Sequence, residues 1–261
     1  MARACVAAVV LILPGAWAQP AMAPPLLGFV EDSASALRPA YGVSGNFILG
    51  PSVASKILSV AFSGSIGLLK TDSSLASFDS HGNLLASLDV ASGPALFAFS
   101  PAGTTALAFI ASTNELVEWR GSAFAALEFH DEEVAASAVL AIAFPTPFEA
   151  ALIVQRKDAV WELNVPLGAV GISSQKALIG VRAPVLALPS GDLVYRDVGG
   201  IVVRSPHGSD VHIAASLPEG FSLQQMNQDW VQLTDLNSSA HFAIHTAAGR
   251  EGFYQLPEST R

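Results

Sequence analysis

Four histidines near the end of the chain come closest to the spacing of a metal site. They are His207, His212, His241 and His245. His241 and His245 are four residues apart, so on a strand they would share one face, and with a carboxylate they could bind a transition metal. No third ligand recurs at a fixed spacing, and two of the four fall in or beside predicted turns. We therefore expect solvated or hydrogen-bonded histidines and no metal site.

Other patterns that could carry chemistry are weak. The acidic stretch HDEE (130–133) lacks the alternating Asp or Asn and the Gly of a calcium loop, so it predicts a solvated loop. No G-x-S-x-G sequence occurs, which excludes an esterase-type serine elbow. Gly199-Gly200 has no accompanying Lys and does not indicate a phosphate-binding loop. The sequence thus identifies no catalytic residue and predicts no cofactor.

Aromatic residues recur at matching positions. Trp119 and Trp161 are 42 residues apart, and Phe78 lies 41 residues before Trp119. These side chains could form a ladder for sugars, but equivalent positions of stacked repeats usually make the repeated core, so we expect packing. The segment EGFSLQQMNQDWVQL (219–233) carries amides where other units have small turns, and we interpret it as a diverged turn.

Composition places the chain among globular proteins. Of its 261 residues, 51% are apolar and 13% are charged, which suits a large core and excludes disorder. The formal net charge is −9, and no basic run occurs. Nucleic-acid binding requires Lys and Arg to replace counterions, so we expect no nucleic-acid partner.

The first residues have the features of a secretory signal. Arg3 precedes an apolar run (6–13), and Ala16-Trp17-Ala18 fits cleavage before Gln19. We expect a signal peptide over 1–18, with an uncleaved N-terminal anchor as the alternative. Cleavage would remove the only Cys and leave 19–261 as one domain without disulfides or a membrane span. The predicted location is periplasmic or extracellular.

A repeat of 41 or 42 residues runs along the chain. Its anchors are Leu37, Phe78, Trp119, Trp161, Val203 and Ile244. Apolar runs of strand length flank the anchors and are separated by Gly, Pro, Ser and Asn. The clearest copies of the first run are VAFSG (60–64), FAFSPAG (97–103), IAFPTP (142–147) and LALPSG (186–191). The one helix candidate, 130–144, is interpreted as a loop and a strand because its second half aligns with these copies.

Four short strands in a unit of about 41 residues, repeated about six times, predict a β-propeller. The stretch SLASFDSHGNLLASLD (74–89) resembles the third and fourth strands of a WD-repeat blade, with Phe78-Asp79 as the aromatic–Asp pair. Trp119-Arg120 and Trp161-Glu162 keep only the aromatic residue, and the family's Gly-His pair is missing. The resemblance therefore extends to NHL and quinoprotein-like blades. It covers most of 26–256 and implies a fold without an activity.

The predicted fold class is all-β, a propeller of about six four-stranded blades. Residues 26–49 match 192–215 and supply the second, third and fourth strands of a blade. The first strand of that blade must come from elsewhere, with the C-terminal tail as the candidate. The alternative is five blades with 26–49 as an added edge.

Two functions are consistent with such a ring. The first is a non-enzymatic binding or scaffold module with a protein or peptide partner on one face. The second is an exported propeller enzyme, a hydrolase or lyase acting on carbohydrate. Propeller enzymes gather acids or a His around the central channel, whereas the acids here are scattered along the sequence, and the predicted mouth turns are Ser, Pro and Gly. We therefore expect a monomeric binding module.

Overall fold

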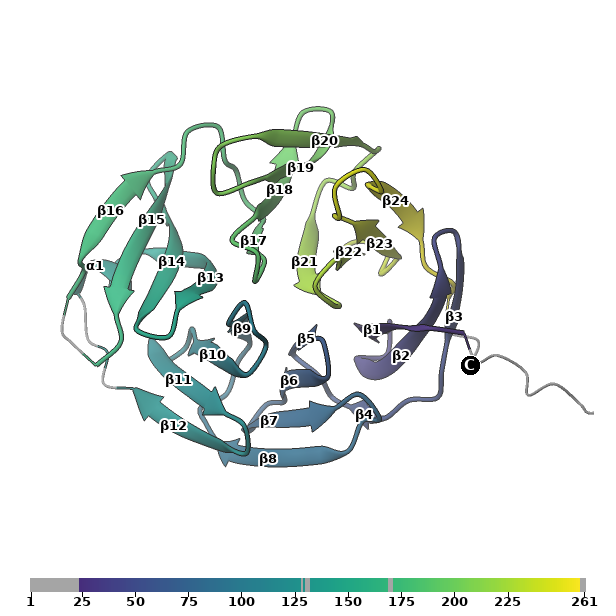
Figure 1. The fold of residues 1–261 in the computed structure, drawn as a ribbon, viewed down its shortest axis with the longest axis horizontal. Helices are drawn as coiled ribbons and strands as arrows, with labels where there is room; N and C mark the ends of the chain where they lie inside the picture. The colour runs from purple at the N-terminus through teal and green to yellow at the C-terminus, as the bar shows by residue number, and fades with distance from the viewer. Residues whose placement is uncertain (1–23, 128, 130–131, 169–170, 259–261) are drawn as a thin grey trace, which may run out of the picture.

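The computed structural model describes residues 24–258 except 128, 130–131 and 169–170. The predicted signal peptide, including Cys5, lies outside the described residues. Within them, six antiparallel sheets of four strands stand radially around one axis (Figure 1). The chain is a six-bladed β-propeller, as the repeat predicts. The described residues contain no helix long and apolar enough to span a membrane.

The first three blades follow one another along the chain. The first blade contains β1 (Leu26–Glu31), β2 (Ala36–Val43), β3 (Asn46–Leu49) and β4 (Ala54–Ser55). The second contains β5 (Ser59–Ser63), β6 (Ile66–Lys70), β7 (Ser74–Asp79) and β8 (Leu84–Asp89). The third contains β9 (Ala95–Phe99), β10 (Thr105–Ile110), β11 (Glu115–Arg120) and β12 (Ala123–Leu127).

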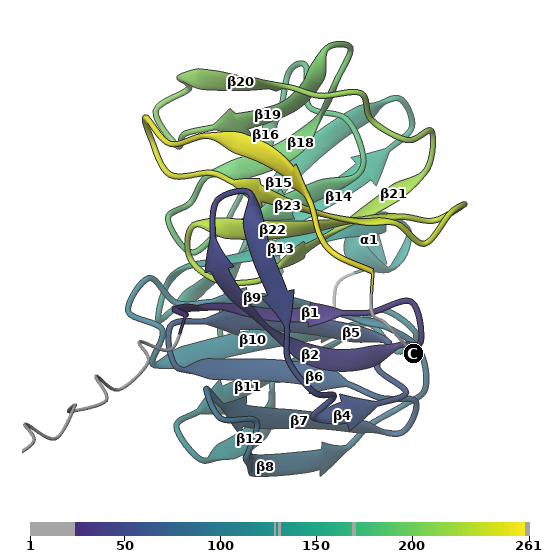
Figure 2. The same cartoon turned by 90° about the vertical axis from the view of Figure 1, so that its right-hand side faces the viewer.

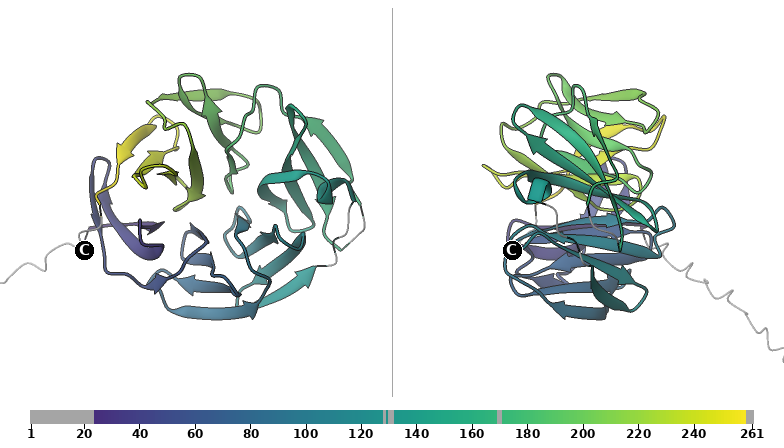
Figure 3. Two further views of the ribbon diagram at one scale, coloured as in Figure 1. Left: turned by 180° about the vertical axis from the view of Figure 1, so that it is seen from behind. Right: turned by 90° about the vertical axis from the view of Figure 1, so that its left-hand side faces the viewer.

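The last three blades complete the ring, seen from behind and from the side in Figure 3. The fourth contains β13 (Ala138–Thr146), β14 (Glu149–Arg156), β15 (Ala159–Pro166) and β16 (Ser174–Ala177). The fifth contains β17 (Val185–Ala187), β18 (Leu193–Asp197), β19 (Gly200–Arg204) and β20 (Asp210–Ala214). The sixth contains β21 (Phe221–Gln225), β22 (Trp230–Asp235), β23 (His241–His245) and β24 (Gly252–Gln255).

The repeat anchors occupy equivalent strands. In blades two to six they lie on the third strand from the axis: β7, β11, β15, β19 and β23. Leu37 lies on β2. Phe78 and Trp119 are each 2% exposed and pack in cores between blades, whereas Trp161 is only partly buried against such a core. The aromatic positions are therefore packing positions, most strongly at Phe78 and Trp119.

The first blade differs from the others. Both β3 and β4 pair with β2, so this sheet is only three strands wide. The strand β1 lies beside β22, which is a second strand of its blade, and β5 and β21 meet at the axis. Five innermost strands thus surround the channel. Residues 26–49 supply the second, third and fourth strand positions, as predicted, and complete a sixth blade.

The predicted source of a missing first strand is wrong. The tail does not pair with β1, whose only strand partner among the described residues is β2. Instead the Leu256 N–H donates to the His241 carbonyl at 2.9 Å, and the Leu256 side chain is buried at the junction of blades one and six. Figure 2 shows these two blades side by side. The ring therefore closes by contacts between the first and sixth blades, without a strand exchanged between the chain's ends.

Candidate binding groove

Two pockets adjoin on one face of the ring. The first, named the acidic pocket, has a volume of about 510 Å³ and lies between the fifth and sixth blades. The second, named the proline pocket, has a volume of about 330 Å³ and lies between the fourth and fifth blades. Both are lined by Pro101, Pro189, Ser190 and Ser205. The two pockets therefore adjoin along the fifth blade, and together they are called the groove.

Three turns of the same design build the walls of the groove. They are SPAG (100–103), LPSG (188–191) and SPHG (205–208). In each turn the Gly N–H donates to the carbonyl three residues earlier, at 2.8 to 2.9 Å. Pro fixes φ at the second position, and the Gly accepts the positive φ that the fourth position needs, for example +67° at Gly103 and +86° at Gly191. The backbone of each of these three turns is therefore conformationally restricted.

Side-chain hydrogen bonds hold the polar groups around the groove. The Ser190 hydroxyl donates to Asp192 at 2.7 Å. The hydroxyls of Ser205 and Ser209 are 2.6 Å apart across the neighbouring turn. The Thr246 hydroxyl donates to the Asp229 carbonyl at 3.1 Å, which joins two turns of the sixth blade. These bonds reduce the side-chain freedom that a bound partner would otherwise have to remove.

The acidic pocket carries uncompensated negative charge. Its lining includes Asp192, Asp229 and Glu251, and none of its described lining residues is basic. Glu251 accepts the Gly249 N–H at 2.9 Å, and its own N–H and that of Gly249 lower the pKa of its carboxyl. Glu251 is therefore ionised at neutral pH and suits a cationic group.

The charges of the proline pocket are largely paired. Arg204 donates two hydrogen bonds to Asp210, at 2.7 and 2.8 Å, which raise the pKa of the guanidinium and lower that of the carboxyl. Lys176 lies opposite Glu162 in the register of β15 and β16. The remaining lining is mostly apolar, including Pro145, Pro189 and Pro206. This pocket therefore suits an aliphatic or proline side chain.

The central channel is a separate feature. Its cavity of about 260 Å³ is lined by all five innermost strands and by Glu31. Glu31 is the only ionisable residue among the described residues of this lining, and burial raises the pKa of its carboxyl. A single ionisable side chain cannot supply a separate acid and base.

The predicted histidine cluster is spread over two blades. His207 and His212 are exposed on the fifth blade, and His241 and His245 begin and end β23. The His245 ring lies 4.4 Å from the Trp230 ring. Across the described part of the chain, no three His, Cys, Asp or Glu residues gather as a metal site.

Two local expectations need correction. The region predicted as loop and strand contains α1 (Glu132–Ala135) before β13, where the Ala136 N–H donates to the Glu132 carbonyl at 3.0 Å. Acids at a helix start favour this turn, while 130–131 lie outside the described residues. Gln224 and Gln225 belong to β21, so only 226–229 form the turn. Of that turn, Gln228 and Asp229 line the acidic pocket.

Three of the acids that are scattered along the sequence lie close together in the structure. Asp192, Asp229 and Glu251 are distant in sequence, but the turns of adjacent blades bring them to one pocket. The proline turns that recur after residues 99, 187 and 204 were the sequence feature that could have predicted the groove walls. The convergence of acids depends on which blades are neighbours, which the one-dimensional pattern does not resolve.

Comparison with known proteins identifies the fold class. No protein-family model matches the chain, and no curated protein matches it. Among solved structures, TolB from Acinetobacter baumannii is 17% identical with a TM-score of 0.55, over 89% of this chain and 63% of that one. A chain of a nidogen/laminin complex is 12% identical with a TM-score of 0.55, over 89% of this chain and 98% of that one. At these identities the likeness shows the β-propeller fold alone.

Proposed function

We propose that the protein is an exported, non-enzymatic binding propeller that holds an extended segment of a partner protein in the groove. The observation that carries this proposal is the pair of adjoining pockets whose walls include three hydrogen-bonded proline turns. Propeller rings commonly host binding surfaces on one face, and a preorganised groove reduces the entropic cost of binding.

The charges favour one kind of segment. A Lys or Arg side chain would enter the acidic pocket beside Asp192, Asp229 and Glu251. An aliphatic or proline residue would lie in the proline pocket, against Pro189 and Pro206. The proposed ligand is therefore an extended peptide with a basic residue next to an apolar one.

The experiment places a photo-crosslinking amino acid at Ser190, which is exposed in the groove, in the mature chain. The matched control places it at Asp158, which is exposed in the turn between β14 and β15 at the opposite face. We expect a partner crosslinked at 190 and absent at 158. A peptide from that partner should bind the mature chain, and Ser205→Trp, which fills the shared wall, should weaken binding at least about tenfold. Equal crosslinking at both positions would contradict the groove.

The carbohydrate-enzyme alternative has one observation in its favour, the three acids of the acidic pocket. Glycoside cleavage needs one protonated and one ionised carboxyl on either side of the bond. The carboxyl whose pKa is raised, that of Glu31, lies in the channel instead, and Glu251 is held ionised. Hydrolysis of a polysaccharide that Asp229→Asn abolishes would favour the enzyme over the binding module.

Export is the second part of the proposal and has its own test. When the full chain is expressed in its source, the mature protein should begin at Gln19, because small residues at 16 and 18 fit the cleavage pocket. N-terminal sequencing decides this. A mature protein that still begins at Met1 or Ala2 would favour the uncleaved anchor.

A further inference from the structure

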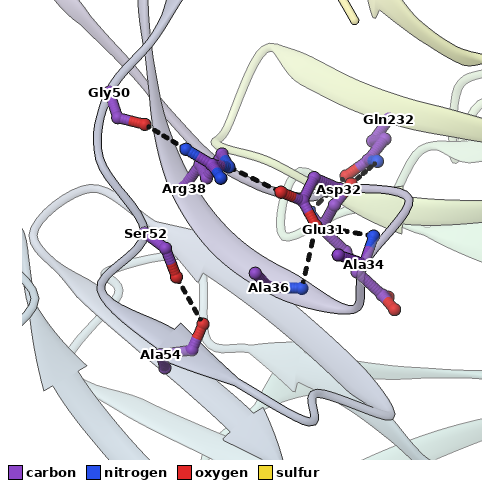
Figure 4. A network of polar contacts seen from close by, with 9 residues as sticks. All are labelled: Glu31, Asp32, Ala34, Ala36, Arg38, Gly50, Ser52, Ala54 and Gln232. Carbon is purple, nitrogen blue, oxygen red and sulfur yellow. Dashed lines mark hydrogen bonds and ion pairs between the residues drawn. The ribbon is translucent and has the colours of Figure 1, made fainter. Parts of the chain in front are cut away.

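The junction of the first and sixth blades, here called the seam, depends on one buried amide. The Gln232 side chain is 1% exposed and reaches from β22 to Glu31 on β1. Its Nε2 donates to the Glu31 carbonyl at 2.8 Å, and its Oε1 accepts the Glu31 N–H at 3.1 Å (Figure 4). One side chain therefore satisfies both backbone groups of one residue.

Those backbone groups have no strand partner. The Asp32 N–H donates to the Ala36 carbonyl, so Asp32 faces β2. Because hydrogen-bonding direction alternates along an antiparallel strand, the Glu31 backbone faces the other way, toward the side where β1 pairs with no strand of the described residues. Gln232 thus replaces the missing strand at this position. Buried backbone groups without a partner are costly, so the orientation of the amide matters for closure.

A histidine fixes the same amide from the other side. The His241 Nδ1 lies 2.8 Å from Gln232 Nε2 and 3.1 Å from the Thr234 hydroxyl. The two hydrogen bonds to Glu31 fix the orientation of the Gln232 amide, so Nε2 is the amide atom that faces the His241 imidazole. Gln232 Nε2 also lies 3.2 Å from the Thr234 hydroxyl. An amide N–H can only donate, so the 2.8 Å contact is a hydrogen bond only when Nδ1 accepts, which places the proton of a neutral His241 on Nε2, an atom buried without a hydrogen-bond partner among the described residues.

Protonation of His241 would turn this attractive contact into a repulsive one. A proton on Nδ1 would face the Gln232 NH₂ group, and two donors repel each other. Rotating the Gln232 amide so that Oε1 faces the His241 imidazole would place the NH₂ group against the Glu31 N–H and Oε1 against the Glu31 carbonyl. Both bonds to β1 would then be lost. If Gln232 stays bound to Glu31, a charged His241 places two donors 2.8 Å apart, with the Thr234 hydroxyl as the acceptor that both must share.

We propose that His241 is a pH-sensitive latch, whose protonation releases Gln232 from Glu31 and loosens the closure of the ring. This inference does not depend on the proposed partner. A cavity of about 400 Å³ beside the seam gives solvent a route to this region. The charged residues around it are Glu31 at the end of β1, Asp32 directly after it and Glu258 in the tail, while Arg38 on β2 is paired with Asp32.

The pH window follows from the direction of the pKa shift. Burial lowers the pKa of His241 below its ordinary 6.5, and the charge of Asp32 opposes this shift. The unfolded chain therefore takes up the proton first as the pH falls. The stability that the neutral His241 imidazole contributes is fully present above about pH 6.5. It is lost as the pH falls through the lowered pKa of His241 in the folded chain. The raised pKa of Glu31 acts in the opposite direction.

The test compares the mature wild-type chain with His241→Asn. The Asn Oδ1 lies where Nδ1 was, so it keeps an acceptor for Gln232 but does not titrate. Between pH 7.5 and pH 5, the Tm of the wild type should fall roughly 2–4 °C further than that of H241N. Glu31 is present in both chains, so their difference isolates His241. The matched control is His81→Asn, because the side chain of His81 is 81% exposed and its removal should leave the profile unchanged.

Amide exchange provides a readout at the seam that does not need a variant. In the wild type, exchange of the Glu31 N–H, corrected for its intrinsic pH dependence, should accelerate about tenfold or more as His241 becomes protonated. The midpoint should match the titration of the His241 ring followed by NMR. Unchanged protection of Glu31 across that titration, or equal Tm profiles for wild type and H241N, would overturn the latch.

Discussion

The backbone of Gly28 lies directly against the backbone of Met226 across the seam. A Cβ on Gly28 would be 1.9 Å from the Met226 carbonyl oxygen, and Gly28 has a φ of +145°. Met226 is fully buried, and it packs with Trp230 and Leu256 in the core between the first and last blades. The ring therefore closes through a close backbone approach that only glycine permits.

Gly28→Ala should loosen this closure. The added methyl group combines a backbone clash with an unfavourable φ, and together these should cost roughly 2–5 kcal/mol of unfolding free energy. Denaturant unfolding of the mature chain measures this cost. Gly64→Ala is the matched control, because Gly64 also has a positive φ, +64°, but nothing lies within 4 Å of its added Cβ. Equal losses in both variants would mean that strain, not the close approach, explains the effect.

The two tryptophans of the repeat should differ in their contribution to stability. Trp119 is 2% exposed within the core of the second and third blades, so Trp119→Ala should cost roughly 3–5 kcal/mol. Trp161 is only partly buried, and Trp161→Ala should cost less than Trp119→Ala. Thermal unfolding of both variants tests this order. An unchanged Tm in W119A together with lost sugar binding would instead support an aromatic ladder.

A buried carboxylate makes the first blade sensitive to acid. The Asp32 side chain is 2% exposed and accepts the N–H groups of Ala34 and Ala36, at 2.8 and 3.0 Å, and the Arg38 guanidinium (Figure 4). Burial alone would raise the pKa of Asp32, but these bonds lower it below the ordinary 3.8. Its stabilisation is therefore present above about pH 4 and is lost as the pH falls through the lowered folded pKa.

Asp32→Asn should remove about 1.5–3 kcal/mol at neutral pH, because the bond from Arg38 loses its charged acceptor. The difference from wild type should narrow as the pH is lowered toward 2. Asp79→Asn is the control, since Asp79 accepts the N–H groups of His81 and Asn83 in the same pattern and no Arg of the described residues pairs with it. If D32N and D79N lose equal stability, the Arg38 pair contributes nothing.

The sequence predicts the repeated blades better than it predicts the contacts by which the first and sixth blades meet. Leu37 and five later anchors keep one period because each occupies an equivalent strand, so the repeat reports local structure directly. Gln232 offers no such signal, because it departs from the repeat and its partner Glu31 is 201 residues away. The pairing exists only once the ring has closed. It could not be found from a period that describes one blade at a time.

Prediction from the sequence is limited in the same way at the groove. The prolines of its turns were visible in the sequence because turn geometry depends on adjacent residues, such as Pro189 and Gly191. The acidic pocket was not visible, because Asp192, Asp229 and Glu251 meet only when the fifth and sixth blades stack. Local physical rules thus predict the parts, and the order of the blades determines which parts meet.

Removing the first blade should open the ring. Phe29 makes edge-to-face contacts with Phe62 and Phe78, at ring distances of 5.0 and 5.1 Å, and so joins the first blade to the second. On its other side, Leu27 packs with Met226 and Trp230 of the sixth blade. A chain that begins near Ser55 would expose both apolar faces and the free strands beside them, which promotes aggregation.

We therefore expect the truncated chain to self-associate and to unfold at a lower temperature than the mature chain. Light scattering after gel filtration and thermal unfolding measure these two effects. Phe29→Ala in the intact chain is the milder companion variant and should cost roughly 3–5 kcal/mol while the ring stays monomeric. The opposite result has a physical basis, because β5 and β21 already meet at the axis without a strand from the first blade. A truncated chain that is monomeric and equally stable would show that five blades close by themselves and that the first blade is an added edge.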